Sequence, residues 1–188
     1  MEKKRLYVLC ASVLPLMICS GLVYSMFSLY MSTVLLAPIS QIGLVYMVGS
    51  LVGLLFGPLL GKVSDRFGRK PVILGAMASF AVIFVLYFRA PDYHVVYGIQ
   101  ILEGAAWVAI GAAVTAYIAD IVTSDKRGWA MGVYQQTIAI GWMIGPAFGG
   151  FLSEAIGFRN IFLVGAIIEV VGFILVLFLV KESRDQRD

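Results

Sequence analysis

The order of apolar and polar positions divides the chain into six long apolar runs separated by short polar segments. An α-helix of roughly 20 apolar residues can cross about 30 Å of hydrocarbon. The runs cover residues 6–30, 40–60, 72–88, 94–119, 131–152 and 161–180. The pattern predicts an all-α membrane protein, one bundle of six transmembrane helices, with residues 181–188 as the start of a cytoplasmic central loop or tail.

The composition agrees with a membrane location. Of the 188 residues, 61% are hydrophobic and 13% are charged, which is outside the range of soluble domains. The basic start before the first run, Met1 to Arg5, imitates a secretory signal peptide, but the run is too long for one and five more follow, so we expect a retained helix. The net charge of +3 does not indicate nucleic-acid binding, because the basic residues are spread over loops.

Lysine and arginine residues are distributed unequally between the two sides of the predicted bundle. Only Arg89 and Arg159 lie on the side opposite the termini. The other twelve lie on the terminal side: Lys3, Lys4, Arg5, Lys62, Arg66, Arg69, Lys70, Lys126, Arg127, Lys181, Arg184 and Arg187. Cytoplasmic loops are enriched in these residues, so we expect a multi-pass protein of the inner or plasma membrane with both termini in the cytoplasm.

One long charged segment, residues 61–71, interrupts the apolar part of the chain. It carries five charges and two glycines, which favours a tight, solvated turn between the second and third helices. Pro71 suits the first turn of the helix that follows, because proline lacks an N–H group and has a fixed φ.

The same segment has a counterpart 89 residues later. Gly61, Ser64, Asp65, Gly68 and Lys70 correspond to Gly150, Ser153, Glu154, Gly157 and Arg159. Three spans end on the opposite side of the membrane from where they begin, so a second copy of a three-span unit has the opposite orientation. The internal similarity therefore predicts an inverted 3+3 repeat, an arrangement that many secondary transporters use.

Two motifs extend over the predicted helices. The segment between helices 2 and 3 has the pattern G-x-x-x-D-R-x-G-R-K, formed by Gly61, Asp65, Arg66, Gly68, Arg69 and Lys70. Helix 5 has the pattern G-x-x-x-G-P-x-x-G-G, formed by Gly141, Gly145, Pro146, Gly149 and Gly150. The first is similar to the signature G-x-x-x-D-R-x-G-R-R/K of the major facilitator superfamily, and the second is similar to the motif of its drug:proton antiporter branch. The whole chain thus resembles the N-terminal half of such a transporter.

The resemblance implies roles for these residues. Asp65, Arg69 and Asp120 are expected to form a charge network that holds a cytoplasmic gate closed, although all three could instead be solvated loop charges. The helix 5 motif is expected to bend that helix at Pro146 and to shape an interface between bundles, although helix packing alone also explains its glycines. The family implies a partner, a second six-helix half, supplied by a C-terminal half or a second copy.

Helix 4 departs from the family pattern R-x-x-Q-G, because it has Gln100 and Glu103 and no arginine there. Gln100, Glu103 and Trp107 share one helical face, which we interpret as a cavity site for a proton or substrate. An ionised carboxylate near the bilayer centre costs on the order of 2.5–3.5 kcal/mol, so Glu103 needs a wet cavity, a partner or a proton. The alternative is a protonated structural glutamate bonded to a neighbouring helix.

Other candidate residues carry weaker signals. Glu169 lies at a similar depth in helix 6, which is peripheral in the resembled fold, and its functional and structural interpretations are equally supported. Cys10 and Cys19 are nine residues apart on one helix and cannot form a disulfide with each other. With one histidine and no cysteine cluster or phosphate loop, the sequence predicts no metal and no cofactor.

Together these observations predict a secondary transporter that exports small lipophilic or cationic compounds in exchange for protons by alternating access. Its partners would be the lipid bilayer, a small-molecule substrate and the proton. The alternatives are a solute importer of the same superfamily and a non-transporting six-helix subunit or fragment. A membrane enzyme is disfavoured, because the spans contain no nucleophile with a nearby base.

Overall fold

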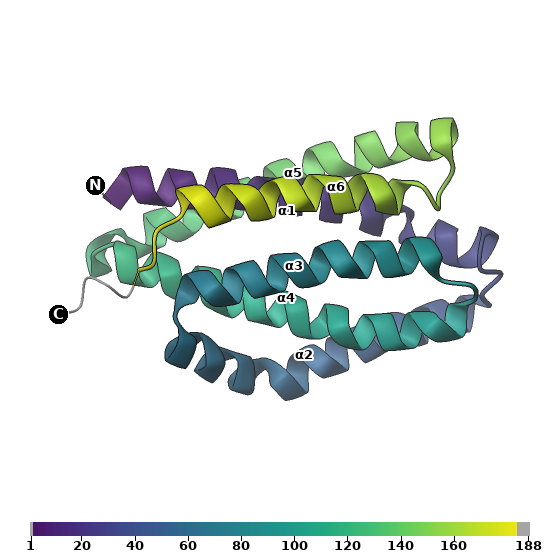
Figure 1. Cartoon of the computed structure of the whole chain (residues 1–188), viewed down its shortest axis with the longest axis horizontal. Helices are drawn as coiled ribbons and strands as arrows, with labels where there is room; N and C mark the ends of the chain where they lie inside the picture. The colour runs from purple at the N-terminus through teal and green to yellow at the C-terminus, as the bar shows by residue number, and fades with distance from the viewer. Residues whose placement is uncertain (1, 184–188) are drawn as a thin grey trace.

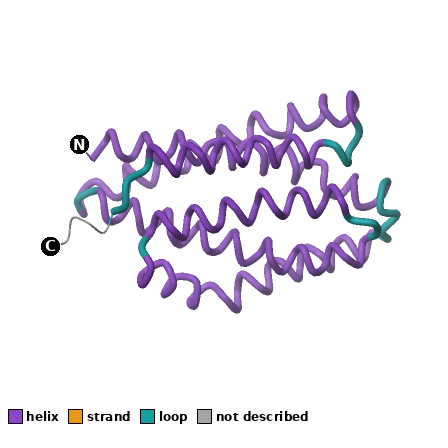
Figure 2. The backbone as a smooth tube through the Cα atoms, in the orientation of Figure 1, coloured by secondary structure: helices purple, strands orange, loops and turns teal. Residues whose placement is uncertain are grey.

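A computed structural model of the chain describes residues 2–183, which form six long helices joined by short loops (Figures 1 and 2). The helices are α1 (Glu2–Thr33), α2 (Ile39–Phe67), α3 (Arg69–Arg89), α4 (Tyr93–Ile121), α5 (Arg127–Ile156) and α6 (Ile161–Leu179), with one 3-10 turn, η1 (Ser124–Lys126). Residues 2–183 contain no β-strand. All six helices are long and apolar enough to span a bilayer, so the chain is a multi-pass membrane protein.

The connection between α2 and α3 is much shorter than the sequence suggests. The predicted turn over residues 61–71 is wrong for most of that segment, because α2 continues through the charged residues to Phe67 and α3 begins at Arg69. Only Gly68 breaks the helix, with a φ of +96° that favours glycine. Pro71 is the third residue of α3, where its missing N–H costs no helical hydrogen bond.

Both ends of the described chain lie at the same end of the bundle, which we call the terminal end (Figure 1). The helices α1, α3 and α5 run from the terminal end to the opposite end, and α2, α4 and α6 return. Residues 181–183 follow α6 and contact the bundle, whereas residues 184–188 of the predicted central loop lie outside the described residues.

Helix packing follows the predicted inverted repeat. The most extensive contacts are those of α1 with α5 and of α2 with α4, and α3 packs on α4 and on α6 while α1 packs on α6. The same pairs result when α1, α2 and α3 are exchanged with α4, α5 and α6. The pair α1–α5 then becomes α4–α2, the pair α3–α4 becomes α6–α1, and the pair α3–α6 stays the same. Because the two units begin at opposite ends of the bundle, the repeat is inverted, as the sequence predicts.

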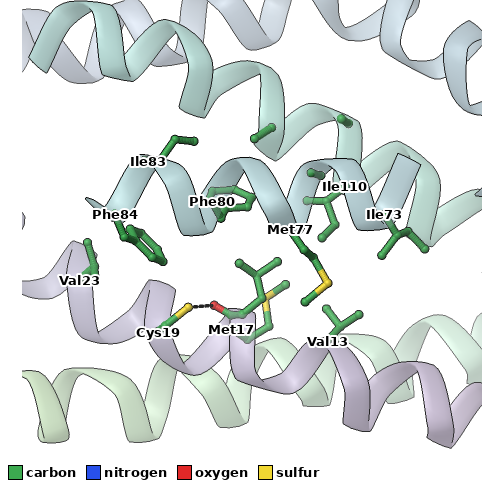
Figure 3. Close-up of a cluster of buried hydrophobic side chains, with 14 of the residues drawn as sticks. Val13, Met17, Cys19, Val23, Ile73, Met77, Phe80, Ile83, Phe84 and Ile110 are labelled. Carbon is green, nitrogen blue, oxygen red and sulfur yellow. Dashed lines mark hydrogen bonds between the residues drawn. The ribbon is translucent and has the colours of Figure 1, made fainter. Parts of the chain in front are cut away.

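The core forms where apolar side chains of α1 and α3 meet. Met17 of α1 and Met77, Phe80 and Phe84 of α3 are almost completely buried, and Figure 3 shows these side chains between the two helices. The helices α2 and α5 have the smallest buried share of the six spans. They expose large apolar side chains, including Leu54, Leu55, Met143, Phe148 and Phe151.

Glycines allow the closest helix contacts. A Cβ atom on Gly145 would lie 2.5 Å from the carbonyl oxygen of Ile18 and 2.6 Å from the nitrogen of Leu22, so the backbones of α5 and α1 touch there. Gly141 and Gly149 also face the α1 backbone, whereas Gly150 faces open space. Three of the four motif glycines of α5 therefore pack inside this bundle.

Candidate functional site

A buried polar cluster lies between α3 and α4, around Glu103. The Glu103 side chain is 1% exposed, and its Oε2 atom accepts hydrogen bonds from the Tyr87 hydroxyl and from Nε2 of Gln100, the latter at 2.7 Å. Gln100 Nε2 also lies 2.8 Å from the Tyr87 hydroxyl oxygen. The other carboxyl oxygen of Glu103, Oε1, has no hydrogen-bond partner among residues 2–183. The cluster thus holds one carboxyl oxygen firmly and leaves the other for a proton or a ligand.

Close packing of α2 on α4 orients this cluster. A Cβ atom on Gly104 would meet the Gly49 carbonyl oxygen, and one on Gly49 would meet Oε1 of Gln100. The carboxamide oxygen of Gln100 therefore lies against Gly49, and its NH₂ group faces Glu103 and Tyr87. The Tyr30 hydroxyl donates a 2.7 Å hydrogen bond to the Tyr87 carbonyl, which ties the end of α3 to α1.

The cluster forms part of the wall of a cavity of about 290 Å³ between α1, α2 and α4. Its lining includes Tyr24, Tyr46, Ser50, Gln100, Glu103 and Trp107. A second cavity of about 430 Å³, lined by residues that include Thr115, Tyr134, Gln135 and Trp142, also contacts Trp107. Trp107 therefore lines both cavities, one of which is bordered by α2 and the other by α5.

Trp107 belongs to an aromatic group. Its Nε1 atom donates a 2.7 Å hydrogen bond to the Tyr24 hydroxyl, and the Tyr24 ring stacks on Trp142 with ring centroids 6.3 Å apart. The structure thus brings Gln100 and Glu103 together as predicted by their spacing, but the polar group of Trp107 is directed to Tyr24. Nothing in the α4 pattern alone indicates Tyr24 or Tyr87, because both lie on other helices.

The terminal end carries a second cluster, which contains the three residues of the expected charge network. Arg69 Nη1 lies 2.6 Å from Asp65 Oδ1, and Arg69 Nε lies 3.0 Å from Asp120 Oδ2. The side chains of Arg69 and Asp120 are 12% and 7% exposed, whereas that of Asp65 is 70% exposed. Arg69 therefore joins the end of α2, the start of α3 and the end of α4.

Residues that follow α6 complete this cluster, and the sequence motifs do not predict them. Glu182 accepts hydrogen bonds from the backbone N–H groups of Arg69, at 3.0 Å, and Lys70, at 3.1 Å. It thereby satisfies two free donors at the start of α3 and places a negative charge at the positive end of the helix dipole. The Ser183 hydroxyl donates to Asp120 Oδ2 at 3.1 Å.

The remaining motif residues between α2 and α3 have separate surroundings. The Lys70 ammonium donates a 2.8 Å hydrogen bond to the Leu177 carbonyl at the end of α6. The Arg66 guanidinium lies 5.6 Å from the centroid of the Phe67 ring, and Gly61 faces open space.

Glu169 lies in the interior of the bundle and lines neither cavity. Its side chain is fully buried, with Oε2 3.5 Å from the Cys19 sulfur and Oε1 without a hydrogen-bond partner among residues 2–183. Figure 3 shows Cys19 on α1 beside the buried side chains of α3, with its hydrogen bond to the Leu16 carbonyl dashed. Both cysteines are buried and free.

Comparison with known proteins gives a consistent result. The model of the Major Facilitator Superfamily matches residues 9–188. The chain is 30% identical to multidrug resistance protein 2 of Bacillus subtilis, covering 97% of the chain and 45% of that protein. It is 33% identical to the class C tetracycline resistance protein of Escherichia coli, covering 77% of the chain and 36% of that protein.

A solved structure shows the same fold. The human organic anion transporter MFSD10 (TETRAN) superposes with a TM-score of 0.78 over 97% of this chain and 48% of that one, at 17% sequence identity. The chain thus spans less than half the length of these relatives. With its six-helix inverted repeat and a family match over nearly its whole length, the chain belongs to the Major Facilitator Superfamily.

Proposed function

We propose that the chain is one half of a proton-coupled secondary transporter that exports small lipophilic or cationic compounds by alternating access. Glu103 binds the coupling proton or the cationic part of the substrate. The terminal end faces the cytoplasm, because it carries ten of the twelve lysine and arginine residues that residues 2–183 contain. The membrane is then the inner or plasma membrane of the cell.

The observation that carries this proposal is the asymmetric environment of the Glu103 carboxyl group. Two donors, Tyr87 and Gln100, support the charged form through Oε2. The unpartnered Oε1 can take a proton, which removes the cost of a charge in the bilayer, on the order of 2.5–3.5 kcal/mol. A carboxyl group that is supported in both forms at a cavity wall suits reversible protonation.

The aromatic group next to Glu103 favours a lipophilic cation as substrate. The faces of tyrosine and tryptophan rings attract cations, with a gain of about 0.5–2 kcal/mol per contact. Tyr24, Trp107 and Trp142 supply such faces beside the two cavities. The relatives named for multidrug and tetracycline resistance support export of drug-like compounds by this chain as well.

A second six-helix bundle is part of the proposal. The chain spans 45% of multidrug resistance protein 2, which leaves room in that protein for another bundle of this size. The exposed apolar faces of α2 and α5 flank the two cavities, so a bundle packed there would close them into a path across the membrane. We therefore place the substrate between the two six-helix halves, where such a path would form.

The cluster around Arg69 supports a gate at the cytoplasmic end. Its ion pairs join the ends of three helices at the side where a second bundle would meet α2. We infer that the cluster is intact when the transporter is closed to the cytoplasm, and that it loosens when the cytoplasmic side opens.

The test uses the purified protein in proteoliposomes with an imposed pH gradient and a lipophilic cationic dye. Glu103→Gln should reduce gradient-driven dye movement by about 5- to 150-fold, the usual range for a coupling free energy of 1–3 kcal/mol. Glu169→Gln is the matched control, because it neutralises another buried carboxyl group that does not line the cavities.

Two results would contradict the proposal. Equal loss in both variants would mean that Glu103 matters only for the fold, and unchanged dye movement in Glu103→Gln would remove it as the coupling site. The mass of the protein in detergent, measured in parallel, tells whether the second bundle is supplied by another chain.

A further inference from the structure

The loop between α5 and α6 repeats the loop between α2 and α3 at the opposite end of the bundle. Gly68 ends α2 and Gly157 ends α5, with φ values of +96° and +82°. Their N–H groups donate to the carbonyls of Ser64, at 3.2 Å, and Ser153, at 2.9 Å. The backbone conformation of the loop therefore repeats after 89 residues, as the sequence does.

Side-chain contacts follow the same offset. Lys70 donates to the Leu177 carbonyl at 2.8 Å, and Arg159 donates to the Phe88 carbonyl at 3.3 Å. The two donors are 89 residues apart, and so are the two acceptors. In each repeat, a basic side chain near the start of the third helix (α3 or α6) therefore binds a carbonyl group near the end of the third helix of the other repeat. The two ends of the bundle are built alike.

The charge network breaks this symmetry. Glu154 corresponds to Asp65, but the position that corresponds to Arg69 is Phe158, so the in-chain cation is absent. Glu154 is exposed in the last turn of α5 and forms no ion pair within residues 2–183. A carboxylate thus occupies the gate position at the opposite end without the partner that the terminal end provides.

The cations of that end in this chain are engaged or remote. Arg159 donates to the Phe88 carbonyl. Arg89 ends α3, which is not among the helices that pack substantially on α5. The outer part of α5 is uncovered, with Phe151 77% exposed.

We propose that Glu154 is the gate carboxylate of the opposite, outer end, and that its partner is a lysine or arginine on the second six-helix bundle, which packs against α5. This inference rests on the proposed function, because it needs that second bundle. The pair forms when the outer side is closed and breaks when it opens. The cytoplasmic gate thus draws its main cation from this chain, and the outer gate draws it from the other half.

The test measures how far the cavity is open to the outside. Ser50 lines the cavity of Glu103 and is exposed, so Ser50→Cys provides a reporter, while the native cysteines are buried. A membrane-impermeant maleimide is added from the outer side to the assembled transporter without a pH gradient, and the labelling rate is recorded.

The expected result is a graded series. Glu154→Asp should label at the wild-type rate, Glu154→Gln about two- to fivefold faster, as expected for loss of an exposed ion pair, and Glu154→Lys faster still because it repels a cation. Asp92→Asn is the control, since it removes another carboxylate of the same end while asparagine can still cap α4. It should leave the rate unchanged.

Two outcomes would overturn the inference. Equal rates in wild type, Glu154→Gln and Glu154→Lys would show that the carboxylate has no gate partner, and a slower rate for Lys than for Gln would show that the partner is an anion. Failure of the proposed function looks different: the wild-type labelling rate would then not respond to an imposed pH gradient, whatever the Glu154 series shows.

Discussion

Arg69 Nε lies 3.0 Å from Asp120 Oδ2, and this ion pair joins the first residue of α3 to the last turn of α4. Both side chains are largely shielded from solvent, so water screens their attraction less than it would at a fully exposed site. Water therefore screens this pair less than it screens the pair of Arg69 with Asp65, whose side chain is 70% exposed.

Arg69→Ala should lower the free energy of unfolding by about 1.5–3 kcal/mol, the usual contribution of a hydrogen bond to a charged group. Thermal unfolding in detergent measures this loss. The matched control is Lys126→Ala, whose ammonium lies 3.2 Å from Glu2 between much more exposed side chains, and it should cost at most about 1 kcal/mol. Equal losses would mean that the Arg69 contacts are as weak as a surface pair.

Glu182→Ala should remove the cap of α3 and cost about 0.5–2 kcal/mol of stability. Because Glu182 accepts from the N–H groups of Arg69 and Lys70, hydrogen exchange at these two amides should become faster. Glu2→Ala, another glutamate of the terminal end, should leave both exchange rates unchanged. Unaltered exchange in Glu182→Ala would show that the chain after α6 does not cap α3.

Gly145→Ala should destabilise the protein by about 1–3 kcal/mol, because the new methyl group would meet backbone atoms of Ile18 and Leu22 that can move only if α1 and α5 separate. Gly150→Ala, five residues along the same helix, faces open space and should be neutral or slightly stabilising. The unfolding midpoints of the two variants give the comparison. If Gly145→Ala were as stable as Gly150→Ala, the close α1–α5 contact would be disproved.

Tyr87→Phe should weaken gradient-driven transport by about tenfold or more, since the charged form of Glu103 would lose one of its two donors. Dye movement in proteoliposomes under an imposed pH gradient measures the effect. Tyr117→Phe is the control, because the Tyr117 hydroxyl donates to the Lys181 carbonyl at the terminal end, far from Glu103. Transport unaffected by Tyr87→Phe would show that Gln100 alone suffices.

The start of α4 should depend on pH through Asp92. Its carboxylate accepts from the backbone N–H groups of His94, at 2.8 Å, and Val95, and the first of these bonds in particular lowers the pKa of Asp92 below its ordinary value. A lowered pKa means that the cap is fully formed above the unfolded value of about 3.9 and is lost as the pH falls through the folded value. Protection of the His94 and Val95 amides against hydrogen exchange, relative to an unfolded peptide at the same pH, should fall below that pH in wild type, whereas Asp92→Asn should show no such transition.

The sequence predicts the helices and the inverted repeat well, because both depend on patterns within the chain. Each helix corresponds to one apolar run, and the similarity between segments 89 residues apart relates the two three-helix units. The sequence also predicts that Gln100 and Glu103 lie together, since residues three apart share a helical face. The exact end of α2 at Phe67 is not predicted, because charged residues can extend a helix beyond the apolar region as easily as they can form a loop.

Contacts between helices are beyond these patterns. The Tyr87 bond to Glu103 depends on how α3 is placed along α4, and the Glu182 cap depends on where the chain turns after α6. Neither the placement of α3 along α4 nor the turn after α6 produces a periodic pattern in a single sequence. The proximity of Asp120 to Arg69 was expected from family resemblance, and spacing alone relates only Asp65 to Arg69.

The backbones of α1 and α5 touch at Gly145, and beside this contact Tyr24 and Trp142 stack with their ring planes 15° apart. Helices that are locked at this distance cannot slide or roll against each other without breaking the contact. The two rings are therefore held in one fixed arrangement by the contact between the helices. In the proposed alternating access, α1 and α5 would then move together, and a ligand bound to the two rings would keep this contact during the movement.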